Sequence, residues 1–356
     1  MSDNDAYVNE LVSLSRRRPH TMRALWILCI AEVPFLPPYD ALRAAILAHV
    51  VANSFDVTTC EFSHKRRVGN VGRGPREFVS PLGVALVAYD TVIVCDYDNS
   101  RLSVVQIAGD KDTFVKTITN LAVMQEPVCV AAIGGDNTGS TIVVSCVAHK
   151  HIFAMRWKDE AITGPMVKFA SPKGLAAVPN RIDVVLVGDD KRNTISLVDI
   201  VVGVVLNVIS NGVGVPYGMV AAGKDVLIYV DHSKPSNVRV IRWTDGTILR
   251  KIETEVPKGL DDPRGICLVD EDTVAVMDCD NNRVVFLSWR EGTFLRALKT
   301  PCAPFFCALM GNQRTLAVTS STSDCIYLAE DFLEEVGASV HNPLMSPHSL
   351  IDNGPS

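Results

Sequence analysis

The stretch PLGVALVAYDTVIVCDYDNSR at residues 81–101 decides the fold, because it recurs along the chain. Its clearest second copy is PRGICLVDEDTVAVMDCDNNR at residues 263–283. Six copies lie between residues 81 and 329, and their anchoring prolines are separated by 46, 45, 44, 47 and 41 residues. The anchors are Pro81, Pro127, Pro172, Pro216, Pro263 and Pro304.

Each copy predicts four short strands. A small apolar run follows the proline, and a β-branched run such as residues 91–94 or 273–276 follows the next polar turn. The third run alternates polar and apolar residues, as at 101–105, and a fourth run follows in most copies. A period of this length is typical of one propeller blade. The sequence therefore predicts an all-β fold, a six-bladed β-propeller of four-stranded blades.

The repeats resemble a known family, the NHL repeats, which form six-bladed β-propellers. The match is best at residues 69–78, GNVGRGPREF, which lead into Pro81-Leu82-Gly83. The copies at Pro172 and Pro216 keep the Pro-x-Gly of the first strand, whereas Cys129 and Phe306 replace the glycine in two others. The resemblance covers about residues 57–330.

Ring closure needs a strand from outside the six repeats. The last copy ends in a poor strand, EDFLEE at residues 330–335, and a ring left open would expose the edges of its first and last blades. Residues 57–67 lie just before the first anchor, and we expect them to pair with residues 325–328 in a shared sixth blade. We therefore assign the propeller to residues 56–332 and a flexible tail to residues 333–356.

Residues 1–55 lack the repeat and read as a short helical N-terminal extension. Apolar residues at helical spacing in 40–52 predict an amphipathic helix with Asp40 as its N-cap. One interpretation is a cap packed on the propeller. The other is an F-box-like segment, because residues 36–50 resemble the opening of an F-box, which docks substrate receptors onto ubiquitin-ligase scaffolds.

Composition restricts the function classes. The net charge of −6 gives no general attraction to nucleic acid or to an anionic membrane, and no signal peptide or membrane span is evident. The chain has 10 cysteines but no Cys-x-x-Cys, and most lie in apolar runs, which favours buried, reduced thiols. We expect an intracellular, cytoplasmic protein.

The loops before strand one and between strands two and three are expected to open on one face. That face should gather the chain's repeated acidic, amide and basic side chains and form the binding face. Its candidate residues are Asp96, Asp98, Asn99, Arg101, Asp189, Arg192, Asp231, His232, Asp278, Asp280, Asn282 and Arg283, accompanied by Asp190 and Lys191.

These residues allow several functions. Carboxylates near an axis could hold a divalent cation, as in the gluconolactonase-like six-bladed hydrolases, and a related propeller lyase uses zinc. Basic residues at 64–67, with Arg73 and Arg76, allow RNA binding. Recurrence in several blades instead favours a structural role, with Asp96 and Asp278 tying turns and Asn99/Asn282 and Arg101/Arg283 completing them. We predict a non-catalytic protein-interaction scaffold without a cofactor. A ubiquitin-ligase substrate receptor, a metal-dependent hydrolase or lyase and an RNA-binding propeller remain as alternatives.

Overall fold

The computed structural model describes residues 60–61, 64–108, 111–120, 122–134, 141–253, 256–330 and 332. The predicted helical segment at residues 1–55, with its cap and F-box-like interpretations, lies outside these residues, as does the predicted tail at 333–356. Within the described part of the chain, no helix has the length and apolar character needed to cross a membrane.

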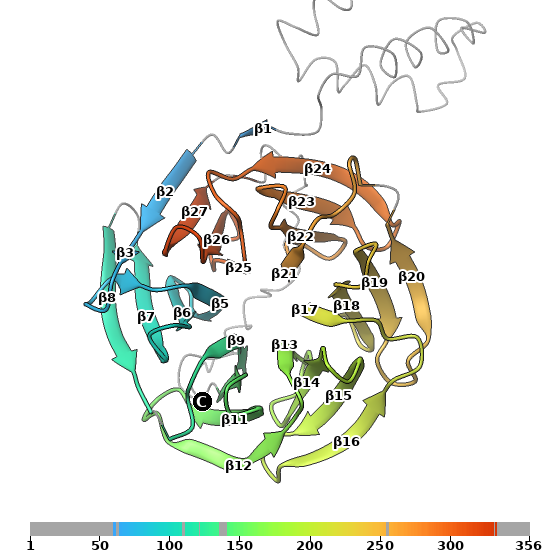
Figure 1. Ribbon diagram of the computed structural model, residues 1–356, viewed down its shortest axis with the longest axis horizontal. Coiled ribbons are helices and arrows are strands. Elements are labelled where there is room, and N and C mark those ends of the chain that lie inside the picture. The colour runs from blue at the N-terminus through green and yellow to red at the C-terminus, as the bar shows by residue number, and fades with distance from the viewer. Residues whose placement is uncertain are drawn as a thin grey trace, which may run out of the picture. The chain divides into compact units, whose positions relative to one another are not determined.

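Six antiparallel sheets surround a central axis, so the described residues form the predicted six-bladed β-propeller (Figure 1). Blade 1 contains β5 (Pro81–Ala88), β6 (Thr91–Asp96), β7 (Arg101–Ala108) and β8 (Lys111–Ile118). Blade 2 contains β9 (Pro127–Ile133), β10 (Thr141–Cys146), β11 (His151–Arg156) and β12 (Ile162–Lys168). Blade 3 contains β13 (Pro172–Ala177), β14 (Val184–Asp189), β15 (Thr194–Asp199) and β16 (Val204–Ile209).

The second half of the ring repeats this order from the axis outward. Blade 4 contains β17 (Pro216–Ala222), β18 (Val226–Asp231), β19 (Asn237–Arg242) and β20 (Ile248–Ile252). Blade 5 contains β21 (Pro263–Leu268), β22 (Thr273–Asp278), β23 (Arg283–Ser288) and β24 (Thr293–Lys299). Blade 6 contains β25 (Cys307–Leu309), β26 (Thr315–Ser320), β27 (Cys325–Glu330) and, outermost, β2 (His64–Val68).

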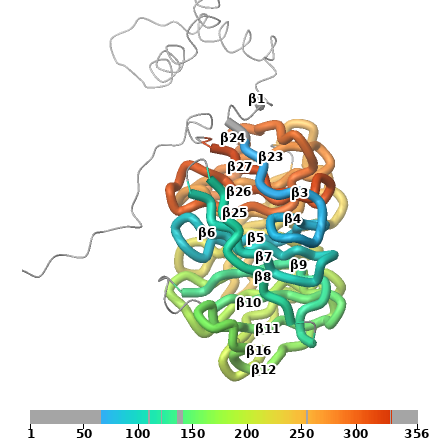
Figure 2. Tube along the Cα trace, turned by 90° about the vertical axis from the view of Figure 1, so that its left-hand side faces the viewer, coloured from blue at the N-terminus to red at the C-terminus, as the bar shows by residue number. Residues whose placement is uncertain are grey.

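The second strand of each blade is the most deeply buried. Every residue of β6, β14, β22 and β26 is buried. Both faces of these strands pack against neighbouring blades, which explains their unbroken β-branched runs. The apolar core therefore lies between blades, and Figure 2 shows the ring from its edge with the blades following one another.

The N-terminal strand closes the ring, as predicted. Strand β2 pairs antiparallel with β27, with His64 opposite Glu330 and Val68 opposite Ile326. The Val68 side chain is 1% exposed and belongs to the main core cluster. The prediction placed all of residues 57–67 in the sixth blade, which was wrong for β1 (Cys60–Glu61). This strand pairs in parallel with β24 of blade 5.

The glycine of Pro-x-Gly lets neighbouring inner strands approach closely. A Cβ atom on Gly174 would overlap the carbonyl oxygen of Tyr217 in the next blade. A Cβ atom on Gly218 would likewise overlap the carbonyl oxygen of Arg264. The missing side chains therefore bring the residues between proline and glycine together around the axis.

Candidate functional site: the anchor face

The anchoring prolines and the turns between strands two and three open at the same end of each blade. Pro81 pairs with Asp96, which pairs in turn with Arg101 across the next ladder. Pro263, Asp278 and Arg283 repeat this arrangement. We call this end the anchor face, defined by the six prolines and the turns at residues 97–100, 147–150, 190–193, 232–236, 279–282 and 321–324. A short parallel pair, β3 (Asn70–Val71) and β4 (Glu77–Phe78), precedes the first proline.

Four of the predicted face residues are buried carboxylates that hold loops in place. Asp96, Asp189, Asp231 and Asp278 are all 0% exposed. Each accepts a backbone N–H from the loop before its own blade's proline, at 2.8 Å from Val79, 2.7 Å from Ala170, 2.8 Å from Val215 and 2.8 Å from Asp261. These carboxylates act on their own blades and do not face a ligand.

Arg101 and Arg283 complete this scaffold. Arg101 Nε donates to Asp96 Oδ2 at 2.6 Å, and Arg283 Nε donates to Asp278 Oδ2 at 2.6 Å. Their remaining guanidinium nitrogens donate to loop carbonyls, including Glu77 O at 2.8 Å and Gly259 O at 2.6 Å. Both arginines are buried, so blades 1 and 5 each contain a buried ion pair that holds the loop before the anchoring proline.

The prediction that Asn282 is the equivalent of Asn99 in its own repeat was wrong. Asn99 Nδ2 donates to Asp96 at 2.9 Å, but the matching donor to Asp278 is Asn281, at 3.0 Å. Asn282 instead has φ 49° and matches Ser100, with φ 50°. Asparagine tolerates the left-handed region, so two adjacent asparagines satisfy the amide role and the turn role separately.

The other blades depart from this arrangement, because the residues opposite their carboxylates are Asn237 in blade 4 and Thr194 in blade 3. In blade 4, Arg239 Nη2 lies 2.6 Å from Asp231 Oδ2 and supplies the guanidinium from within the third strand. In blade 3, Arg192 lies 3.8 Å from Asp189 and its side chain is 59% exposed. Blade 2 places Cys146 opposite His151, and blade 6 places Ser320 opposite Cys325.

Several predicted face residues reach the surface beside the scaffold. Asp98 is exposed and accepts the Ser80 hydroxyl at 2.5 Å, and Asp280 is also exposed. His232 is half-buried, with Nε2 2.6 Å from Asp262 Oδ1. Of the predicted set, Asp98, Lys191, Arg192, Asp280 and Asn282 are exposed and Asn99 and His232 are half-buried, so these residues are open to a partner on the anchor face.

A ring of residues around the axis was not predicted from the sequence. The position after the anchoring proline contributes one residue per blade, on the inner strand in blades 1 to 5 and just before it in blade 6. These residues are Leu82, Val128, Lys173, Tyr217, Arg264 and Phe305. The first two are buried, whereas Lys173, Arg264 and Phe305 are half-buried. The ring was detectable as the x of Pro-x-Gly, but its members share no chemistry and therefore form no motif.

Aromatic rings meet across the axis. The Tyr217 ring of blade 4 lies 6.4 Å from the Phe305 ring and 6.1 Å from the Phe306 ring of blade 6. Burial raises the pKa of Tyr217 to about 12, even though the nearby Arg264 charge lowers it, so the phenol stays neutral at neutral pH. These rings fill the axial region with apolar side chains.

Arg264 covers this aromatic group. Its guanidinium carbon lies 4.9 Å from the Tyr217 ring centroid and 5.2 Å from that of Phe305, which is within the range of cation–π contacts. Its Nε and Nη2 donate to Asp262 Oδ2 at 2.8 and 2.6 Å. Because His232 contacts the other oxygen, both oxygens of Asp262 are already engaged.

Lys173 is the second cation near the Tyr217 ring, and unlike Arg264 it has no carboxylate partner among the described residues. Its ammonium lies 5.8 Å from the Tyr217 centroid, and no ion pair of Lys173 occurs among the residues that the structure describes. Burial lowers its pKa, although the charge of Asp190 opposes that effect. We call Lys173, Tyr217, Arg264 and Phe305 the axial cluster.

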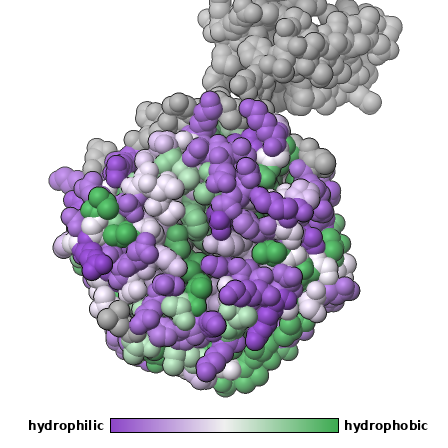
Figure 3. Space-filling model, viewed as in Figure 1, coloured by the Kyte–Doolittle hydropathy of each residue, from purple (hydrophilic) through white to green (hydrophobic). Residues whose placement is uncertain are grey.

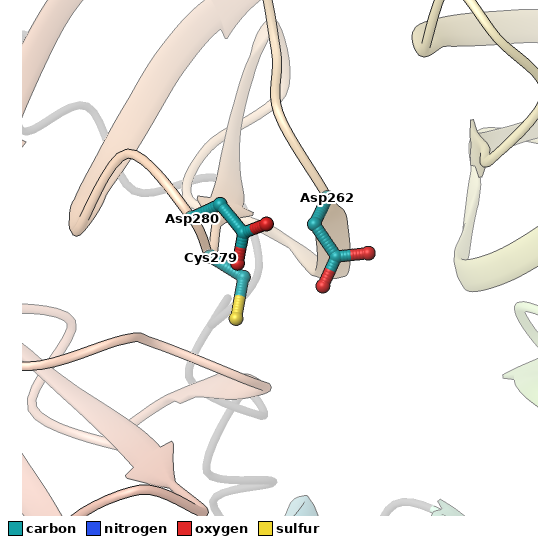
Figure 4. A group of neighbouring side chains, drawn as sticks. All are labelled: Asp262, Cys279 and Asp280. Carbon is teal, nitrogen blue, oxygen red and sulfur yellow. The ribbon is translucent and has the colours of Figure 1, made fainter.

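Asp262, Cys279 and Asp280 lie close together beside the axial cluster. One ligand atom from each lies within 4.8 Å of the others, and Figure 4 shows the three side chains gathered between two loops of blade 5. Burial, followed by the charge of Asp262, raises the pKa of the Cys279 thiol to about 11, so the thiol is neutral. The Arg264 guanidinium, 2.6 Å from Asp262 Oδ2, places a positive charge beside these three residues and so opposes a cation there, which argues against the axial-metal alternative.

The basic residues proposed for RNA are partly used in the structure. Arg66 forms ion pairs with Asp112 and Glu330, and Arg67 donates to Ser323 O at 3.0 Å. Both side chains belong to the outer strand β2. These two arginines therefore make contacts that close the ring at its rim, and only part of their charge is open to an external anion.

Comparison with solved structures shows the fold alone. The chain is similar to the WD40 β-propeller domain of Doa1, at 13% identity and TM-score 0.51, over 74% of this chain and 97% of that chain. It is similar to virginiamycin B lyase from Staphylococcus aureus, at 13% identity and TM-score 0.51, over 74% and 97%. A chain of the Mitotic Checkpoint Complex matches at 8% identity and TM-score 0.54, over 77% and 95%. No protein-family model matches the chain, and no curated protein sequence matches it.

Proposed function

We propose that this chain is a non-catalytic protein-interaction module, an NHL-type propeller whose partner binds on the anchor face over the axial cluster. The observation that carries the proposal is the combination of Lys173, which has no carboxylate partner among the described residues, with the half-buried aromatic ring of Phe305. A partner segment with a carboxylate beside an apolar side chain suits this surface, because it would satisfy the ammonium and cover the ring.

The chemistry of the same cluster supports binding over catalysis. Tyr217 is neutral, the Cys279 thiol is neutral, and Asp262 is held by Arg264 and His232. A hydrolase or lyase needs a base, a nucleophile or a metal with free ligand positions. The lyase among the similar structures therefore supports the fold and not an activity in this chain.

The alternative function, a ubiquitin-ligase substrate receptor, would add a second binding surface outside the propeller. It rests on the F-box-like residues 36–50, which lie outside the described residues, and it adds a scaffold without changing the use of the anchor face. The partner on the anchor face would then be the substrate of the ligase.

A charge reversal tests the proposal. The full-length wild-type chain, Lys173→Glu and Lys224→Glu would serve as affinity baits in cell lysate, with quantitative mass spectrometry of the bound proteins. Lys224 is an exposed lysine in the turn between β17 and β18, at the end of its blade opposite the anchor face. It therefore provides a matched control of the same charge change.

We expect proteins bound by the wild type and by Lys224→Glu to fall about tenfold or more with Lys173→Glu, because the ammonium would be replaced by a repelling carboxylate. Thermal unfolding of each bait would confirm that all three are folded. The same bound proteins with all three folded baits would contradict binding at the axial cluster.

A further inference from the structure

The outer edge of blade 3 exposes a largely apolar surface, in which Asn207 is the polar residue of the strand. Strand β16 has the sequence VVLNVI, and the turn before it adds Val201 and Val202. The exposed fractions range from 39% at Val205 to 63% at Val201, and Figure 3 shows hydrophobic surface along the rim where Figure 1 places β16. We call Val201, Val202, Val204, Val205, Leu206 and Val208 the apolar edge.

The outer strands of the other blades are protected by charge or proline. Native sheets blunt exposed edges with such residues, which discourage contact with a second chain. In the described part of the ring they are Lys111, Asp112 and Lys116 in β8, Pro165 and Lys168 in β12, Arg250 and Lys251 in β20, Arg296 and Lys299 in β24, and Arg66 and Arg67 in β2. Strand β16 contains none of these residue types.

A bulge determines how this edge can be used. Asn207 pairs with Leu197 and Val205 pairs with Val198, so Leu206 is an extra residue that interrupts the ladder. The same bulge leaves Val115, Leu249 and Leu295 exposed in β8, β20 and β24, but there it stands beside charged residues. The bulge disfavours a long added strand. Contact at β16 therefore depends on burial of side chains.

A hollow lies beside the apolar edge. Its volume is about 210 Å³. It is lined by Ile182, Ile200 and Val201 of blade 3 and by Thr141, Arg156, Thr163 and Gly164 of blade 2. Ile182 is 72% exposed. One surface thus carries projecting apolar side chains beside a recess that is apolar on its blade 3 side.

We propose that the apolar edge is the interface of a symmetric dimer, formed by a second copy of this chain across a two-fold axis. A two-fold contact places the same patch on both sides. At the charged outer strands this would set like charges against each other, whereas at the apolar edge it would not. The neutral edge is therefore the outer surface best suited to a second copy, and patches of this kind are rarely left exposed on monomers.

Sedimentation velocity of the full chain tests the proposal, at concentrations from about 1 to 100 µM, a range that covers weak and moderate dimers. Leu206→Lys would place a charge at the centre of the apolar edge. Leu249→Lys is the matched control, because Leu249 is the equivalent exposed bulge residue in β20. Hydrogen exchange at residues 204–208 would be measured at the two ends of the concentration range.

We expect the wild type and Leu249→Lys to form dimers, and Leu206→Lys to raise the dimer dissociation constant at least about tenfold, or 1.4 kcal/mol. Exchange at residues 204–208 should slow as wild-type concentration rises. A wild type that stays monomeric over the range overturns the proposal, and so does a dimer unaffected by Leu206→Lys.

Discussion

Arg101 and Asp96 form a buried ion pair that joins three parts of the chain. Arg101 Nε lies 2.6 Å from Asp96 Oδ2, and the Asp96 side chain is 0% exposed. The carboxylate also accepts the Val79 N–H at 2.8 Å, and the guanidinium reaches the Arg73 carbonyl at 2.7 Å. The pair thus attaches the loop at residues 73–79 to strands β6 and β7 of blade 1.

Removal of Asp96 should leave the Arg101 charge buried without its partner. We expect Asp96→Ala to lower the free energy of unfolding by about 3–5 kcal/mol. Asp98→Ala removes an exposed carboxylate from the same turn and should cost less than about 1 kcal/mol. Urea unfolding followed by tryptophan fluorescence measures both values, and equal losses would show that the buried pair has no special role.

His151 should make blade 2 sensitive to acid. It takes the place that Arg101 and Arg283 have in their blades, is buried, and its Nε2 lies 2.9 Å from Val123 O. Burial lowers its pKa below the ordinary value near 6.5, and the charges of His149 and Lys168 act in the same direction. Because the folded-state pKa is lowered, its contribution to stability is present above about pH 6.5 and is lost as pH falls through the folded-state pKa.

A glutamine at position 151 can donate to the same carbonyl but does not titrate. We therefore expect the wild type to lose more free energy of unfolding than His151→Gln between pH 8 and pH 5. Urea unfolding of both proteins at these pH values provides the measurement. Parallel losses would mean that His151 does not titrate differently on folding.

The close approach at Gly174 should not tolerate a methyl group. A Cβ atom there would overlap the Tyr217 carbonyl oxygen on the neighbouring inner strand, so Gly174→Ala must push two blades apart. We expect a loss of about 2–3 kcal/mol in the free energy of unfolding. Cys129 occupies the same repeat position in blade 2, and Cys129→Ala should cost about 1 kcal/mol. If the order of the two losses were reversed, the tight contact would be absent.

The repeat made the fold readable from the sequence. A period set by anchoring prolines predicted six blades, and the poor strand after Glu330 predicted closure by the N-terminal strand, which β2 provides. The two residues of β1 are too short to carry a pattern, so their pairing with β24 was not predicted. The run VVLNVI looks like a buried strand, because apolar periodicity does not distinguish a core strand from an unprotected edge.

The site was less predictable than the fold. Recurrence identified Asp96 and Asp278, but residues that recur in several blades serve the blades, and both proved to be buried scaffold. Tyr217 and Phe305 come from repeats whose prolines are 88 residues apart in the sequence, and only ring closure brings their side chains to 6.4 Å. Residues that differ from blade to blade carry the asymmetry that a single binding site needs, and such residues leave no repeated signal.

Closure by β2 can be tested with two valines that lie three residues apart. The Val68 side chain is 1% exposed and packs in the main core cluster, whereas Val71 in β3 is 64% exposed. Val68→Asp would bury a carboxylate without a partner at the seam between the two ends of the ring. We expect it to lower the free energy of unfolding by more than about 4 kcal/mol, enough to weaken the whole ring because blade 6 joins both ends of the propeller.

Val71→Asp places the same charge in solvent and should change the free energy of unfolding by about 0.5 kcal/mol or less. Thermal unfolding by circular dichroism compares the two variants, and a Val68→Asp protein as stable as Val71→Asp would show that β2 does not hold the ring closed.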